Sequence, residues 1–183
     1  IDTIMSTISR SLAFSDFSEI EKLTLLGAAN IAGSGNRLAN TIIGNTGRNT
    51  LDGGLGNDTL NGGADNDVLI GGVGRDTLTG GLHNDIFKFT STTHSRGSTM
   101  DIITDFDDRG RGNDRIDVSA LFGPRMSYIH DAAFTASGQV RIKDIAGPDV
   151  IVEVNTGGSL AADFSIRLKG TTLAEMSAGD FVL

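Results

Sequence analysis

The sequence predicts an all-β protein, a parallel β-roll followed by an antiparallel β-sandwich-like C-terminal region. Three observations predict it: a nine-residue period over residues 53–88, an apolar residue at the eighth place of each repeat, and alternating strand patterns without that period after residue 90. The chain has 183 residues, which suggests one or two domains. We expect leading irregular β coils that cap the roll at 1–34, the roll at 35–89, and the C-terminal region at 90–183.

Each repeat begins with a glycine pair and carries Asp at its sixth place; the repeats start at Gly53, Gly62, Gly71 and Gly80. Glycine reaches backbone angles that strain other residues, so places one to six suit a turn. Places seven to nine suit a short strand with its central side chain pointing inward. Because each repeat buries one side chain, a core requires several stacked repeats. We expect Leu60 and Leu78 to stack in one sheet, and Leu51, Leu69 and Phe87 in the other. A glycine-rich disordered linker, the alternative, would not keep an apolar residue at every eighth place.

The acidic places predict cation binding. Stacking sets Asp58 beside Asp76, and Asp67 beside Asp85, one strand spacing of about 4.8 Å apart. Like carboxylates at this distance repel unless a cation lies between them. Calcium takes six to eight oxygen ligands, and glycine-rich turns offer carbonyl oxygens. The chain has no cysteine and no histidine pair at a useful spacing, which argues against zinc and copper. We therefore expect several Ca²⁺ ions.

Nonapeptides of this form are an established sign of calcium-binding parallel β-helices, and the region resembles the RTX (repeat-in-toxin, hemolysin-type) family of secreted proteins. In that family one turn supplies ligands from places two, four and six, and the turn two repeats later supplies places one, three and six. The resemblance implies that only place six binds through its side chain and that the other places bind through carbonyls. It implies a first site of Gly54, Gly56 and Asp58 with Gly71, Val73 and Asp76. It implies a second of Gly63, Asp65 and Asp67 with Gly80, Leu82 and Asp85, and a third of Asn45, Gly47 and Asn49 with Gly62, Ala64 and Asp67.

The repeats depart from the family pattern at two places. Asp65 and His83 stand at place four, where glycine is usual, and both residue types tolerate positive φ. Asn40 and Asn49 replace Asp at place six of the degenerate repeats 35–43 and 44–52. Sites there would lack one charge and should be weaker.

The leading residues predict a strand over 19–25. Helix is a competing interpretation of residues 4–14, where apolar residues are four apart. Residues 21–27 are similar to Glu-x-Leu-x-Leu-x-Gly segments that precede RTX repeats.

After Phe87 the pattern predicts strands at 86–89, 100–106 and 114–121, with polar loops at 90–99 and 107–113. A short helix is expected within 122–138, then a hairpin of 139–145 with 149–155, and a strand at 164–170. Residues 101–121 are similar to the connector after the roll in serralysin-type metalloproteases. The resemblance implies that Asp101 closes a last site with Asp76; a solvated loop acid is the alternative. The end, 180–183, is similar to the family's type I secretion signal, with an ordinary terminal strand as the alternative.

Charge and motifs exclude several functions. The net charge of −8 argues against nucleic acid and anionic membranes as partners, and no stretch approaches the roughly 20 apolar residues of a membrane span. The sequence lacks His-Glu-x-x-His and Gly-x-Ser-x-Gly motifs, and His83, His94 and His130 are dispersed. The chain starts without a natural initiator, so we interpret it as a piece of a longer protein.

These observations together predict a non-catalytic calcium-binding module of a larger secreted, extracellular protein. We expect it to meet the type I secretion machinery, to fold on calcium afterwards, and to stabilise a covalently attached N-terminal domain. A polysaccharide or cell-surface binding module is the alternative, and an unmarked hydrolase is the third hypothesis.

Overall fold

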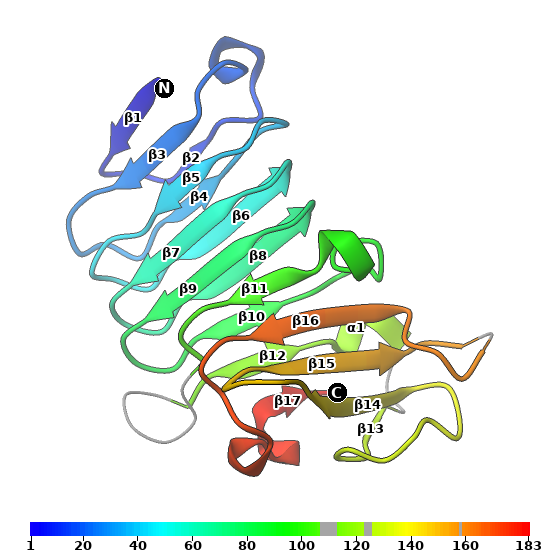
Figure 1. The fold of residues 1–183 in the computed structure, drawn as a ribbon. Helices are drawn as coiled ribbons and strands as arrows, with labels where there is room; N and C mark the ends of the chain where they lie inside the picture. Colours follow the sequence, from blue (N-terminus) through cyan, green and yellow to red (C-terminus); the bar gives the residue numbers. More distant parts are fainter. Residues whose placement is uncertain (107–112, 123–125, 158) are drawn as a thin grey trace.

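The structure is a computed structural model that describes residues 1–106, 113–122, 126–157 and 159–183, and its strands form two sheets (Figure 1). In spatial order the first sheet contains β1 (Thr3–Ser6), β3 (Lys22–Leu25), β5 (Thr41–Ile43), β7 (Thr59–Gly63), β9 (Thr77–Gly81), β11 (Asp101–Ile103), β16 (Phe164–Leu168), β15 (Val150–Asn155), β14 (Gln139–Asp144) and β13 (Ser127–Tyr128). The second contains β17 (Phe181–Val182), β12 (Arg115–Asp117), β10 (Ile86–Lys88), β8 (Val68–Val73), β6 (Thr50–Leu55), β4 (Ala32–Ser34) and β2 (Arg10–Ser11). Odd and even strands of the roll thus alternate between the sheets, which confirms the predicted all-β roll.

The core of the roll consists of the eighth-place side chains. Leu60 pairs with Leu78 in the first sheet, and Leu69 pairs with both Leu51 and Phe87 in the second. All five side chains are fully buried. Burying one such side chain contributes roughly 1.5–3 kcal/mol, so the stack, rather than any single repeat, supports the roll. The predicted stacking is confirmed.

The leading residues join both sheets in parallel. The strand expected at 19–25 is β3, which pairs with β1 and β5. Residues 4–14 contain β1 and β2 and no helix, so the helical interpretation is wrong. The cause lies in the packing: Leu12 is buried, whereas Ile8 is exposed, so the apolar residues four apart do not share one buried face.

The C-terminal strands extend the sheets of the roll. The expected hairpin is the antiparallel pair β14 and β15. β16 pairs antiparallel with β15 and parallel with β11, so the hairpin continues the first sheet and covers the edge of the roll. β12 and β17 continue the second sheet in parallel. Phe89 meets Phe164 edge-on at 5.0 Å between ring centroids, which packs the two parts together.

The helix expected within 122–138 lies earlier, as the single turn α1 (Ser119–Phe122). Asp117 explains why the strand expected at 114–121 stops at β12, because its Oδ1 accepts bonds from the Ser119 amide (3.1 Å) and hydroxyl (2.6 Å). Residues 128–138 are a short strand end, turns and loop. The loop expected at 107–113 falls, except for its last residue, outside the described residues. Within the described ranges, no helix has the length and apolar character needed to cross a bilayer.

Candidate metal centres

The sixth-place aspartates form a buried column along each edge of the roll. Oδ1 of each accepts the backbone N–H of the residue one coil earlier. Asn40 donates to Asp58 at 2.7 Å, and Asp58 in turn donates to Asp76 at 2.8 Å. On the other edge Asn49 donates to Asp67 and Asp67 to Asp85, at 2.7 and 2.8 Å. These bonds hold every carboxylate in the same orientation.

The second oxygen of each carboxylate has no partner. Oδ2 is buried without a hydrogen bond in Asp58, Asp67, Asp76 and Asp85. Burial raises the pKa of Asp58, Asp67 and Asp85 to about 7 and that of Asp76 to about 6, against the lowering effect of the backbone bond to Oδ1. A buried charge without compensation costs several kcal/mol. A cation bound beside the aligned Oδ2 atoms would compensate their charge.

The first-place glycines show what faces those oxygens. A Cβ at Gly53 would lie against both Asp58 Oδ2 and the carbonyl oxygen of Gly71, one coil further. A Cβ at Gly62 would likewise lie against Asp67 Oδ2 and the carbonyl of Gly80. Oxygens of two successive coils therefore face one small space, which glycine keeps free. Each pair belongs to one set of ligands implied by the resemblance, the first and the second respectively.

The carbonyls of places two and four also face the next coil. A Cβ at Gly72 would meet the Gly54 oxygen, and a Cβ at Gly74 would meet the Gly56 oxygen. Positive φ at Gly54 (95°) and Gly56 (121°) produces this direction. Each set implied by the resemblance contains six oxygen donors, and calcium accepts six to eight.

The residues at place three make backbone hydrogen bonds between successive coils. The Val73 carbonyl accepts the Gly56 amide at 2.9 Å, and a carbonyl retains a second lone pair for another partner. The corresponding residues Ala64 and Leu82 donate their amides one coil back, at 3.3 and 3.1 Å, to carbonyls at place two. Cross-coil backbone bonds thus hold this part of the turn.

Asp65 and His83 adopt the positive φ expected of them, 67° and 83°. The Asp65 amide donates to His83 Nδ1 at 3.3 Å, and its carboxylate lies 3.4 Å from Arg48 at the surface. The Asp65 carboxylate thus pairs with Arg48 at the surface, and the carbonyls of Asp65 and Leu82 remain ligands only as the resemblance implies.

Asp101 continues the column beyond the repeats. Its Oδ1 accepts the Asp76 amide at 2.8 Å, and its Oδ2 is buried without a partner. Burial raises its pKa to about 8. The Ser95 hydroxyl accepts the Asp101 amide at 2.7 Å and fixes the strand start. Asp101 is fully buried, so the alternative of a solvated loop acid is wrong.

Two aspartates at this end were not predicted. Asp114 accepts the Asp85 amide at 2.9 Å, and Asp105 accepts the amides of Gly80 and Gly81 at 2.9 Å each. A signal for Asp114 was present: Asp114-Arg115-Ile116 repeats the Asp-x-apolar spacing of places six to eight.

The third implied set is organised differently. Asn49 Oδ1 already accepts the Asn45 amide at 2.7 Å, and Asn49 Nδ2 donates to the Ile31 carbonyl at 3.1 Å. The Gly62 carbonyl still faces the same space, because a Cβ at Gly44 would meet both it and Asn49 Oδ1. The structure brings the set together without an unpartnered oxygen on the asparagine.

Across the described ranges, no group of three or more His, Cys, Asp or Glu side chains gathers as a metal cluster. The candidate centres instead combine aspartate pairs with backbone carbonyls, a donor set that suits a hard cation rather than zinc or copper.

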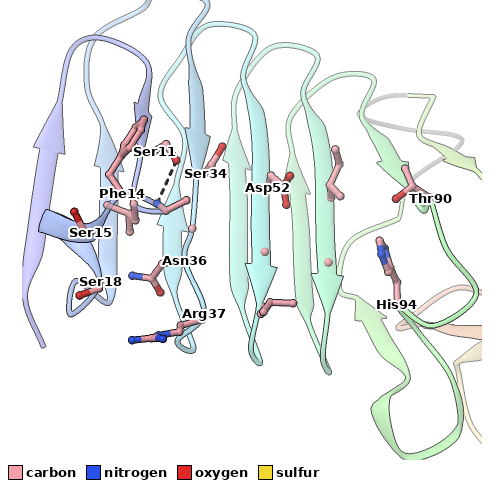
Figure 2. Close-up of a pocket in the computed structure, with 17 residues that line it drawn as sticks. Ser11, Phe14, Ser15, Ser18, Ser34, Asn36, Arg37, Asp52, Thr90 and His94 are labelled. Atoms are coloured by element: carbon pink, nitrogen blue, oxygen red, sulfur yellow. Dashed lines mark hydrogen bonds between the residues drawn. The ribbon is translucent and has the colours of Figure 1, made fainter.

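A groove of about 1080 Å³ crosses the outer face of the second sheet. Figure 2 shows Ser11, Ser34 and Asp52 on successive strands of this face and His94 on the loop after β10. Burial raises the pKa of Asp52 and lowers that of His94, whose Nδ1 is buried without a hydrogen-bond partner. Arg37 and the exposed Phe14 also line the groove. The groove therefore offers polar groups to a ligand.

The chain is similar to a known protein family and to solved structures. The family described as peptidase M10 serralysin C terminal matches residues 11–183. The solution structure of the AlgE6R2 subunit from the Azotobacter vinelandii mannuronan C5-epimerase is similar at 28% identity and a TM-score of 0.57, covering 85% of this chain and 92% of that one. The AlgE6R3 subunit of that epimerase matches at 29% identity over 85% of this chain and 80% of its own, with a TM-score of 0.44. A search of curated proteins found no match.

Proposed function

Since the chain belongs to the peptidase M10 serralysin C-terminal family, we propose that it is a non-catalytic, calcium-binding RTX module of a larger secreted protein. The observation that carries the proposal is the column of buried, unpartnered Oδ2 atoms, of which those of Asp58 and Asp67 face a carbonyl of the next coil. We assign first and second sites to the predicted ligands, and a further site to Asp76 with Asp101. Bound calcium would supply the positive charge that these oxygens lack.

The chain's own residues prepare the sites. The cross-coil bonds to Oδ1 orient the carboxylates, and the first-place glycines keep the space between them free. Without an ion, buried carboxylates and the backbone entropy of glycine oppose folding. Binding free energy would then become folding free energy. The chain would pass a type I secretion channel while its calcium-binding turns are unfolded in a low-calcium cytosol, complete its folding outside the cell, and stabilise an attached N-terminal domain.

Circular dichroism during a calcium titration tests the proposal. We expect β structure to increase as calcium rises through about 10⁻⁴ to 10⁻³ M, and the Asp67→Asn variant to need more calcium. The Asn61→Asp variant, which adds a carboxylate at an exposed position, serves as the control. A chelated protein with full β structure and an unchanged melting temperature would contradict the proposal.

A second function, polysaccharide binding, is supported by the groove and by the similarity to a subunit of a mannuronan epimerase. Calorimetry against polymannuronate at constant calcium tests it. Binding weakened by Arg37→Ala and not by Arg75→Ala, an exposed arginine outside the groove, would support it. No heat at millimolar sugar would rule out this ligand.

A further inference from the structure

Asn40 and Asn49 are buried at the sixth place, where later repeats carry Asp. A Cβ at Gly35 would lie against Asn40 Oδ1, just as a Cβ at Gly53 would lie against Asp58 Oδ2. The amide oxygen of each asparagine therefore takes the position that the unpartnered carboxylate oxygen takes one coil later.

In the asparagine turns that oxygen has a partner. Asn36 donates its backbone N–H to Asn40 Oδ1 at 2.8 Å, and Asn45 donates to Asn49 Oδ1 at 2.7 Å. Asn36 and Asn45 stand at place two, and neither has positive φ, whereas Gly54 at this place has φ of 95°. The different backbone lets the place-two amide close the turn internally.

The amide nitrogens bridge to the preceding coil. Asn40 Nδ2 donates to the Ile20 carbonyl at 3.0 Å, and Asn49 Nδ2 to the Ile31 carbonyl at 3.1 Å. The place-two side chains add four bonds of 2.9–3.2 Å: Asn36 Nδ2 to the carbonyls of Phe17 and Ile20, and Asn45 Nδ2 to those of Leu26 and Ala29. Carbonyl oxygens around every Nδ2 fix the orientation of the amides.

The turns of residues 36–49 therefore contain neutral donors among the carbonyls and no orphan oxygen on the asparagines. A cation here would meet Nδ2 donors among the carbonyls, a neutral amide oxygen that already accepts a hydrogen bond, and one carboxylate where later sites offer two.

We propose that the side-chain amides of Asn36, Asn40, Asn45 and Asn49 replace calcium at this end of the roll. The coil of residues 35–52 is locked to the leading coil without an ion, the third implied site binds none, and cation binding begins between the coils of Asp58 and Asp76. The amide lock does not depend on the proposed function; only the count of ions does.

Hydrogen exchange of the whole chain in chelator tests the lock directly. We expect the amides of β3 and β5 to stay protected, and those of β9 and β11 to become protected only when calcium is added. Equal loss of protection at β5 and β9 in chelator would overturn the proposal.

Substitutions at Asn49 give a second test. Asn49→Asp removes a donor and sets a carboxylate against the Ile31 carbonyl, so we expect it to lower the melting temperature in chelator by about 4–8 °C. The control Asn61→Asp adds the same charge at an exposed position and should leave it unchanged. An unchanged melting temperature for Asn49→Asp in chelator would show that the Asn49 amide does not lock the coils and would overturn the proposal.

Calorimetry counts the ions. Wild type and Asn49→Ala should bind equal numbers of calcium ions, and one ion fewer in the variant would contradict the assignment. Absence of binding in wild type would instead contradict the proposed function, and the exchange experiment in chelator would still decide the lock.

Discussion

The turns of residues 36–49 and those of residues 58–85 follow the same nine-residue pattern but satisfy their buried polar atoms in opposite ways. The Asn40 side-chain amide donates to the Ile20 carbonyl in the preceding coil. Asp58 Oδ1 instead accepts the backbone N–H of Asn40, and its Oδ2 has no partner. The asparagine turns differ from the aspartate turns at two places: an amide stands at place six, and the N–H of place two donates to its oxygen. Places two and six thus decide whether the buried side-chain oxygen has a partner and, on our proposal, whether the turn depends on metal.

Removing calcium should separate the two regions most strongly. At 100 times its dissociation constant, each ion would contribute about 2.7 kcal/mol, and we propose more than one site. We expect chelation to lower the melting temperature by more than 10 °C, with protection lost first at β9 and β11. Calorimetry measures the melting temperature, and hydrogen exchange measures the protection of each strand. Magnesium at equal concentration is the control, since it prefers tighter six-fold geometry and should restore less protection.

The ion-free protein should lose stability as the pH rises. The pKa values of Asp58, Asp67, Asp85 and Asp101 are raised by burial to about 7 or 8 in the folded protein, from 3.8. The folded state therefore holds more protons than the unfolded state between these values. The stabilisation is complete below about pH 4 and is lost through pH 7–8.

Thermal melts in chelator from pH 4 to pH 8 measure this loss. With excess calcium the trend should disappear, because the ion replaces the protons. A melting temperature in chelator that rises over this interval would be inconsistent with buried, unpartnered carboxylates.

A methyl group placed in the space beside one first-place glycine should disturb a single calcium site. Gly62 does not have positive φ, so Gly62→Ala adds only a methyl group between Asp67 Oδ2 and the Gly80 carbonyl. We expect a loss of about 1–3 kcal/mol and one calcium ion fewer by calorimetry. Gly179→Ala, where a Cβ would make an ordinary contact at 3.4 Å, is the matched control. Full ion binding by Gly62→Ala would place the ion elsewhere.

The smallest effect is expected at Ser95, which is fully buried beside Asp101. Ser95→Ala removes the acceptor of the Asp101 amide, and the donor to the Ser165 carbonyl, at a cost of about 1–2 kcal/mol. That corresponds to a drop of about 2–8 °C in melting temperature, measured with and without calcium. The exposed Ser98→Ala should have no effect; an equal drop there would remove the positioning role of Ser95.

The period of the sequence was sufficient to predict the roll. The apolar residue at the eighth place of each repeat, such as Leu60 or Leu78, can be buried only by stacking on its equivalents in neighbouring coils. The register of the strands therefore follows from the nine-residue spacing alone. The positive φ of Asp65 and His83 followed from the same alignment.

Non-local contacts were beyond the sequence pattern. The hairpin β14–β15 is a local feature and was predicted, but the parallel pairing of β16 with β11 joins residues 60 or more apart. Asp114 lies 29 residues after Asp85, so the period could not connect them. The direction of the Asn49 amide depends on the Ile31 carbonyl of another coil, which composition does not reveal.

Residues 180–183, which resemble a secretion signal, include a strand of the folded protein. Phe181 pairs with Ile116 in parallel and is almost fully buried, which makes the segment an integral strand of the second sheet. On the type I secretion proposed above, a transporter could recognise these residues only before β17 pairs with β12. Folding would then bury the signal, so the folded protein would not be recognised again.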